Sequence, residues 1–429
     1  MRNTGLLSLL MIVLLKFTSA QNSADSTVLD SLSTKDCEQK QIGDLFRKKD
    51  KPPKPPKDFM ALILPNISSN PSNGLLLGVG GAISWYMGPQ KTTRVSTGPF
   101  TIAYTSKKQL ITFMKPNIYL KDNKYFFQAD WRFYIYSQPT YGLGTNAPES
   151  GGLPSEFHWQ GEGGSDDSVA FPMNFNYVKL HQIANKKIRE NFYAGIGYHF
   201  DYYYAIEDED LDLDTTPQLL TPHYFYSDKY GFDTTEYILS GLSANLLYDS
   251  RDNMINPYKG IYANLSYRYN LNILGSGQDA SNLWLEFRYF KSLSQKKPRN
   301  VLAFWLFGDF SISGHMPYLT LPALGEDQRA RSGRGYTNGR YRGKNLVYGE
   351  AEWRFPISPC SQILGGVIFV NATTTDNPDR NVALFEYIQP AVGFGLRFMV
   401  NKNFRTNINL DFAIGRETSG FYFSGQETF

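Results

Sequence analysis

Residues 192–201 read FYAGIGYHFD, a run in which apolar side chains alternate with small or polar ones. Successive side chains of an extended strand point to opposite faces, so this alternation predicts a β-strand with two unlike surroundings. One face would meet hydrocarbon and the other an enclosed polar interior. The expected outward residues are Phe192, Ala194, Ile196, Tyr198 and Phe200, and the expected inward residues are Tyr193, Gly195, Gly197, His199 and Asp201.

Two later segments repeat this pattern and place their charged side chains on the inward face. In 281–294, the outward set is Leu283, Leu285, Phe287 and Tyr289, and the inward set is Trp284, Glu286 and Arg288. In 403–416, the outward set is Thr406, Ile408, Leu410, Phe412 and Ile414, and the inward set is Asn407, Asn409, Asp411 and Ala413.

Sixteen such segments follow residue 57, and they predict an all-β fold, a sixteen-stranded antiparallel transmembrane β-barrel over residues 58–429. The even count leaves both ends of the barrel on the periplasmic side. The long connections at 138–168, 208–235, 314–343 and 375–387 then all fall on the exterior side, as is usual for bacterial barrels. The strands are expected near 58–69, 75–87, 93–106, 109–120, 124–137, 169–184, 190–207, 236–251, 259–274, 281–294, 299–313, 344–356, 361–374, 388–401, 403–416 and 418–429.

The composition also favours a membrane barrel. No apolar run after the leader is long enough for a membrane-spanning helix, and the mean hydropathy is only −0.37. Aromatic residues make up 15% of the chain, with 29 Tyr and 30 Phe, and could form girdles at both membrane interfaces. We therefore expect the cell outer membrane as the location and outer-membrane lipid as a partner.

The first twenty residues resemble a secretory signal peptide, which predicts a processed leader at 1–20. Arg2 is followed by an apolar run from Leu6 to Leu15 and by the small residues Thr18-Ser19-Ala20. A retained membrane anchor is the weaker alternative because the apolar run is about half the length that a spanning helix needs.

Residues 21–57 are polar and rich in proline and lysine toward their end, which predicts a disordered periplasmic segment. This segment is either a solvated leader without function or a basic tail that binds anionic lipid or a periplasmic partner. Cys37 and Cys360, the two cysteines of the chain, could pair in an oxidising compartment, although two residues are weak evidence for a bond.

Charge and motifs argue against several classes of function. The net charge is +3, or +1 without Arg2 and Lys16, which is too small to predict a nucleic-acid partner. The sequence has no G-x-S-x-G nucleophile motif, no H-E-x-x-H zinc-protease motif and no Walker loop for nucleotides. We therefore expect no enzyme activity, no catalytic residue, no cofactor and no metal. The histidines are scattered at His158, His181, His199, His223 and His315.

The acidic run at 207–214 could supply oxygen ligands to calcium. It lacks the glycine and the terminal glutamate of an EF-hand loop, so a solvated exterior loop is the favoured interpretation.

The segment 329–344 holds six basic residues and several glycines, which suggests a loop folded tightly back on itself. Such a loop can enter a barrel lumen. In 344–356 the alternation turns Glu350 and Glu352 inward, and we expect Arg334 to pair with Glu352 because an arginine fork matches a carboxylate. The alternative is a strand whose inward charges only line a wet lumen.

Three motifs resemble the BamA/TamA family of outer-membrane proteins, also called the bacterial surface antigen family. Gly333-Arg334-Gly335-Tyr336 resembles the VRGF or VRGY signature of the family's sixth exterior loop. Residues 351–356, AEWRFP, resemble its twelfth strand, and residues 248–260 resemble its D-x-R-D turn. The resemblance implies a loop lock made of Arg334, Gly335, Tyr336, Glu352 and Asn371.

This chain departs from the family in two places. Asn371 stands where the family commonly has an aspartate that also receives the loop arginine, so the loop lock should have one carboxylate fewer. Residues 21–57 are also too few for a folded POTRA domain, so we expect a member that lacks POTRA domains.

The chain ends with aromatic residues in the pattern by which barrel assembly machinery recognises its clients. Phe421, Phe423 and Phe429 should share the outward face, although Glu427 interrupts that face. They would then also serve as interface girdle residues.

Pro65 lies in the first strand, which must meet the last strand to close the barrel. Proline donates no backbone hydrogen bond, so this seam could be weakened for function, or Pro65 could lie near a strand end without a role.

The resemblance implies a role in outer-membrane protein assembly, insertion or transport, with partner subunits in the periplasm or outer membrane. The alternative is a structural or pore-forming barrel without assembly activity.

Overall fold

The computed structural model describes residues 39–45, 58–70, 74–147, 170–216, 218–294, 297–327, 331–358 and 360–429. Residues 39–429 form one compact unit. The predicted signal peptide at 1–20 lies outside the described residues and stays a prediction. His158 and Cys37 also lie outside them.

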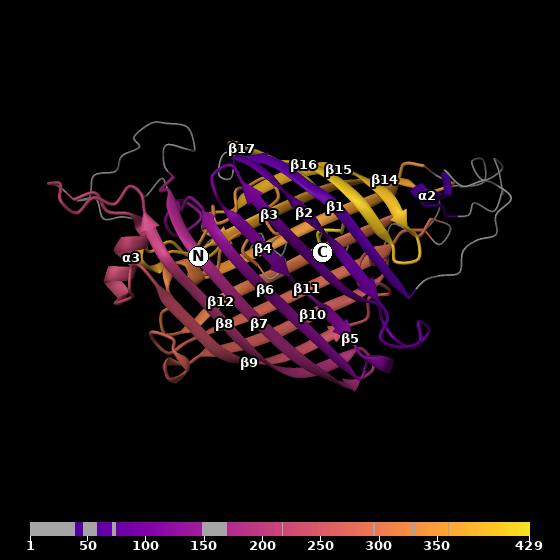
Figure 1. Ribbon diagram of the computed structural model, residues 1–429, viewed down its shortest axis with the longest axis horizontal. Helices are drawn as coiled ribbons and strands as arrows, with labels where there is room; N and C mark the ends of the chain where they lie inside the picture. Colours follow the sequence, from indigo (N-terminus) through magenta and orange to yellow (C-terminus); the bar gives the residue numbers. More distant parts are fainter. Residues whose placement is uncertain are drawn as a thin grey trace, which may run out of the picture. The chain divides into compact units, whose positions relative to one another are not determined.

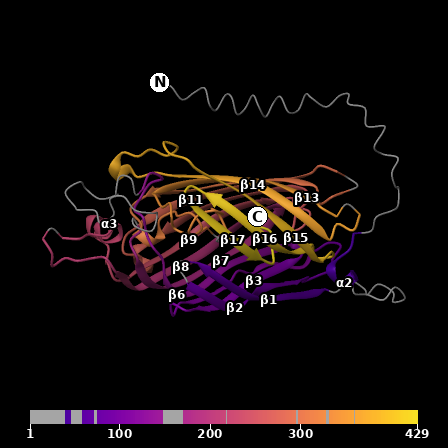
Figure 2. The same ribbon diagram turned by 90° about the horizontal axis from the view of Figure 1, so that it is seen from above.

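The described chain is almost entirely antiparallel sheet, and the sheet curls into a barrel (Figures 1 and 2). Its strands are β1 (Phe59–Asn70), β2 (Gly74–Trp85), β3 (Ser96–Thr105), β4 (Leu110–Met114), β5 (Asn117–Tyr119), β6 (Tyr125–Ser137), β7 (Met173–Arg189), β8 (Phe192–Asp208), β9 (Tyr237–Asp249), β10 (Gly260–Asn270), β11 (Ala280–Ser292), β12 (Val301–Ser313), β13 (Asn345–Pro356), β14 (Leu364–Thr375), β15 (Gln389–Asn401), β16 (Thr406–Gly415) and β17 (Thr418–Ser424). The short helices are α2 (Ile42–Leu45), α3 (Pro222–Tyr230), η1 (Lys121–Asn123), η3 (Asn272–Leu274), η4 (Tyr318–Thr320) and η5 (Pro378–Arg380).

The seventeen strands occupy the sixteen positions that the sequence predicts. Strands β4 and β5 both lie between β3 and β6, and each pairs with both of them. Lys115 and Pro116 separate the two, and a proline cannot donate to the ladder. The fourth predicted strand is therefore one barrel strand with a break, and the predicted fold class is confirmed.

The two faces of the strands differ as the alternation predicts. On β8, Ile196 is 75% exposed on the outside, whereas Tyr193, His199 and Asp201 are buried inside. No helix among the described residues is long and apolar enough to cross a membrane.

The seam lies between the first and last strands. Within the described residues, β1 forms a ladder with β2 and β17 forms one with β16, but no ladder joins β1 to β17. Both views place β15, β16 and β17 next to β1, β2 and β3 (Figures 1 and 2). The two edge strands therefore face each other without the continuous pairing that joins all other neighbours.

The long loop between β12 and β13 enters the barrel and packs there in two buried clusters. One cluster joins its first part, Met316 to Leu321, to inward aromatic residues of β7, β8 and β9. The other joins Leu324, Tyr336 and Tyr341 to inward residues of β11, β12 and β13. The loop thus lies inside the barrel and packs against its inner wall.

Residues 39–45 differ from the disordered segment that the sequence predicts. They include α2, and three of their groups contact turns of the barrel: Lys40 N donates to Ser361 O at 2.8 Å, Lys402 N donates to Gln41 Oε1 at 3.0 Å, and Lys402 Nζ donates to Gln39 O at 3.2 Å. Cys360, in the same region, is disulfide-bonded. The expectation overlooked that polar residues can be ordered by hydrogen bonds to a distant turn.

Candidate functional site

The site is built around the β12–β13 loop, in which glycines adopt backbone angles that are unfavourable for other residues and so allow the chain to turn back. Gly333 and Gly335 have φ angles of +77° and +104°, in the left-handed region. A Cβ at Gly333 would lie 2.4 Å from Leu324 Cγ, and one at Gly335 would lie 3.0 Å from Ala391 Cβ. The two glycines therefore let the loop backbone pack closely while Arg334, between them, reaches the barrel wall.

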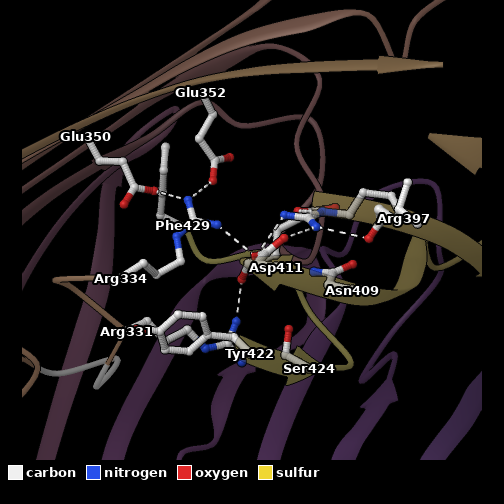
Figure 3. A network of polar contacts seen from close by, with 12 residues as sticks. Arg331, Arg334, Glu350, Glu352, Arg397, Asn409, Asp411, Tyr422, Ser424 and Phe429 are labelled. Atoms are coloured by element: carbon white, nitrogen blue, oxygen red, sulfur yellow. Dashed lines mark hydrogen bonds and ion pairs between the residues drawn. The ribbon is translucent and has the colours of Figure 1, made fainter. Parts of the chain in front are cut away.

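Arg334 binds three carboxylates in the interior (Figure 3). It forms ion pairs with Glu350 and Glu352 of β13, and its Nη1 donates to Asp411 Oδ2 of β16 at 2.8 Å. Its guanidinium also lies 3.5 Å from the ring centroid of Phe369. All four charged side chains are at most 5% exposed, so each charge depends on its partners rather than on water.

The structure brings together the residues that the sequence proposes for the loop lock. Arg334 pairs with Glu352 as expected, and Glu350 joins from the same inward face. Asn371 Nδ2 donates to the backbone oxygen of Arg334 at 3.0 Å. This side chain therefore binds the loop backbone and not the Arg334 guanidinium.

Asp411 is the carboxylate that sequence reasoning missed. The alternation turned Asp411 inward, but nothing in the sequence linked β16 to the loop. The expected shortage of one carboxylate at Asn371 is therefore made up from a different strand, and the sequence could have suggested this only through the inward position of Asp411.

The other two residues of the motif contact the last strands. Gly335 N donates to the hydroxyl of Tyr422 on β17 at 2.8 Å. Tyr336 donates its hydroxyl to Pro390 O on β15 at 2.6 Å and accepts from Arg416 N at 3.1 Å. The motif is thus attached to β15, to the turn after β16 and to β17, beside the seam.

The loop lock continues into a second set of ion pairs that reaches the C-terminus. Arg354 pairs with Glu352, and Arg397 pairs with Asp411. Glu427 joins these two arginines, with its Oε2 at 2.8 Å from Arg397 Nε and 4.0 Å from Arg354 Nε. Buried opposite charges in alternation let each ion have more than one partner.

The C-terminal residue contradicts the prediction that three aromatic residues share the outward face. Phe421 and Phe423 are exposed on the outside, but Phe429 is only 2% exposed. Its ring lies 5.3 Å from Trp305 and 5.9 Å from Phe290, inside the barrel. The alternation fails here because β17 ends at Ser424 and the chain then turns inward.

Pro65 lies in the edge strand of the seam, opposite Val79 of β2. A cavity of about 270 Å³ adjoins it and is lined by residues of β1, by Tyr422 and Gly425 at the other edge, and by Arg334 and Asp411. A functional role of Pro65 stays a prediction.

The D-x-R-D motif forms a rigid turn between β9 and β10. Asp249 accepts two hydrogen bonds from the Arg251 guanidinium, each at 2.9 Å, and one from Arg251 N at 3.1 Å. Asp252 Oδ1 accepts from Tyr258 N at 2.9 Å, and a Cβ at Gly260 would lie 2.4 Å from Ser250 O. These contacts assign the motif a structural task.

The acidic run, predicted as a solvated exterior loop, begins in β8, where the Asp208 side chain is only 3% exposed, and continues in the loop that follows. Asp208 and His223 share a hydrogen bond of 2.7 Å, and Glu209 accepts from Asn174. The described residues contain no group of three His, Cys, Asp or Glu side chains arranged to hold a metal ion.

Comparison with known proteins agrees with the barrel fold. The family model described as the Omp85 superfamily domain matches residues 92–429. No curated protein matches the sequence.

Among solved structures, the fold is similar to BamA from Haemophilus ducreyi lacking POTRA domains 1–3, with a TM-score of 0.52 and 14% identity over 86% of this chain and 71% of that chain. It is also similar to CdiB from Acinetobacter baumannii, with a TM-score of 0.50 and 12% identity over 85% of this chain and 59% of that chain. CdiB from Escherichia coli gives a TM-score of 0.50 and 9% identity over 85% of this chain and 60% of that chain. At such identities the likeness is one of fold.

Proposed function

Because the chain belongs to the Omp85 superfamily, we propose that it acts in outer-membrane protein assembly, insertion or transport, together with partner subunits. The observation that carries this proposal is the position of the loop lock beside an unpaired seam. The proposed location is the cell outer membrane, where the barrel would itself be inserted by barrel assembly machinery.

An unpaired edge strand supports this function chemically. The side of β1 that faces β17 presents backbone N–H and C=O groups that no ladder occupies in the described chain. Such an edge can add a strand from another polypeptide, with main-chain hydrogen bonds that do not depend on its sequence. A client strand in an extended conformation fits this edge.

The alternative role, a structural or pore-forming barrel, is less well supported. The β12–β13 loop packs in the interior through two buried apolar clusters, which leaves little room for a wide aqueous channel. A purely structural barrel would need no unpaired seam, since closure removes exposed edges and is the more stable arrangement.

Depletion of the protein, followed by quantitative proteomics of the outer membrane, tests the proposal. We expect other barrel or surface proteins to fall in abundance and to recover with a wild-type copy or with Arg189→Ala, a control at an exposed arginine. Arg334→Ala should restore them only in part. If depletion changes no other outer-membrane protein, the proposed assembly or transport role is wrong and the structural role remains.

A further inference from the structure

The last strand of the barrel is shorter than its neighbour. Ser424 at the end of β17 pairs with Asn409, but β16 begins three residues earlier, at Thr406. On the other side, β16 pairs with β15 down to Thr406. The register therefore leaves Ile408, Asn407 and Thr406 without partners on β17, although residues 425–427 could continue the ladder there.

Alternation shows what this continuation would do to Glu427. Phe421 and Phe423 face outward, so an extended strand would also turn Gly425, Glu427 and Phe429 outward. Glu427 would then present a carboxylate toward the apolar surroundings of the barrel and would lose its ionic partners, which is unfavourable.

The inward position instead gives the Glu427 carboxylate a complete set of partners. Oε2 accepts from Arg397 Nε at 2.8 Å, and Oε1 accepts from Asn407 Nδ2 at 2.7 Å. The side chain is 2% exposed, and Arg354 lies 4.0 Å away. The backbone of Asn407 has no partner on β17, because the ladder between β16 and β17 ends at Asn409. The Asn407 side chain instead binds the tail, residues 425–429, through Glu427.

The residues around Glu427 are fixed as well. Gln426 O accepts from Asn409 Nδ2 at 2.7 Å and from Arg331 Nη1 of the β12–β13 loop at 3.2 Å. Arg354 Nη2 donates to Phe429 O at 3.3 Å, and its guanidinium lies 5.2 Å from the Phe429 ring centroid. The tail thus contacts the barrel wall and the loop together.

We propose that Glu427 is an internal latch that holds the tail inside the barrel and so keeps β17 from extending beside Phe59–Leu62 of β1. The latch and the loop lock are one unit, because Asp411 binds both Arg334 and Arg397, and Glu352 binds both Arg334 and Arg354. A displacement of the loop would therefore loosen the tail, and release of the tail would let β17 extend.

The extended strand would run along the edge of β1. A Cβ built on Gly425 lies 3.2 Å from Leu62 Cδ2, so the chain already passes beside β1 where β17 ends. Residues 425–427 would then approach Phe59–Leu62, and the backbone groups on that edge would gain partners.

Hydrogen exchange of the full chain in lipid nanodiscs tests this inference without any assay of function. In Glu427→Leu, those amides of Phe59–Leu62 that point away from β2 should exchange at least about ten-fold more slowly than in the wild type, because new ladder bonds protect them. Glu427→Gln keeps the shape and the Asn407 contact but loses the charge, so it should slow exchange to a smaller degree.

Glu417→Leu is the matched control, since Glu417 is an exposed glutamate in the turn between β16 and β17. It should leave exchange at Phe59–Leu62 unchanged. The proposal fails if the folded Glu427→Leu protein exchanges these amides at the wild-type rate, or if Glu417→Leu slows them equally. Should Glu427→Leu not fold, a wild-type exchange rate in Glu427→Gln overturns the proposal in its place.

Discussion

Arg334 is the single side chain on which most of the buried charge of the site depends. It is the shared partner of Glu350, Glu352 and Asp411, which come from two strands that are not neighbours. Within the described part of the chain Glu350 forms an ion pair with Arg334 alone, whereas Glu352 also binds Arg354 and Asp411 also binds Arg397. Loss of the guanidinium would therefore leave Glu350 as a buried carboxylate without a cation.

Arg334→Ala should lower the free energy of unfolding by about 3–5 kcal/mol, because removing one member of a buried ion pair strands its partners. Urea unfolding in lipid vesicles, followed by tryptophan fluorescence, measures this change. Arg189→Ala should alter stability by less than about 0.5 kcal/mol, as expected for an exposed residue. A loss for Arg334→Ala no larger than that of Arg189→Ala would mean that water reaches the loop lock.

At the scale of the element, the β12–β13 loop depends on backbone shape as much as on charge. Gly335 has a φ of +104°, and a Cβ built there would lie 3.0 Å from Ala391 Cβ and 3.1 Å from Gly415 N. Gly231, at the end of α3, has a φ of +71° but no atom within 4 Å of a built Cβ. A substitution at Gly231 would therefore introduce backbone strain alone, whereas one at Gly335 would introduce both backbone strain and steric crowding.

Gly335→Ala should destabilise the inserted loop by about 1–3 kcal/mol, whereas Gly231→Ala should cost about 1 kcal/mol and affect only the end of α3. Limited trypsin digestion of the folded barrel tests this, because Arg331, Arg340 and Arg342 are cleavage sites in the loop. Faster loop cleavage is expected in Gly335→Ala alone. Equal cleavage in both variants would show that close packing at Gly335 does not hold the loop.

At the scale of the whole molecule, loop and wall form one interior, and the barrel is not an empty tube. The buried clusters join the loop to inward residues of most strands from β7 to β13. We therefore expect a small conductance for the wild-type protein in a planar bilayer, because water and ions lack a wide path.

Arg334→Ala should raise the single-channel conductance or make it fluctuate, since the loop is no longer held by the three carboxylates. The recording compares this variant with Arg189→Ala, which should match the wild type. Identical traces for wild type and Arg334→Ala would contradict a loop whose position in the lumen depends on this arginine.

The sequence by itself determined which face of most strands is buried and which loop enters the barrel. Alternation with a period of two is local, so Ile196 and Asp201 could be assigned to opposite faces without knowledge of their neighbours. The glycines around Arg334 and the inward position of Glu352 were equally readable, and the predicted pair forms.

Only the tertiary structure decided which distant residues meet. Asp411 reaches Arg334 because curling of the sheet brings β13 and β16 to the same side of the loop, and residues 39–45 are ordered by turns far along the chain. Phe429 departs from its alternation because Glu427 finds Arg397 and Asn407 inside. Local patterns fix the direction of a side chain within a strand, whereas the end of a strand depends on polar and charged partners that neighbouring strands supply in the folded barrel.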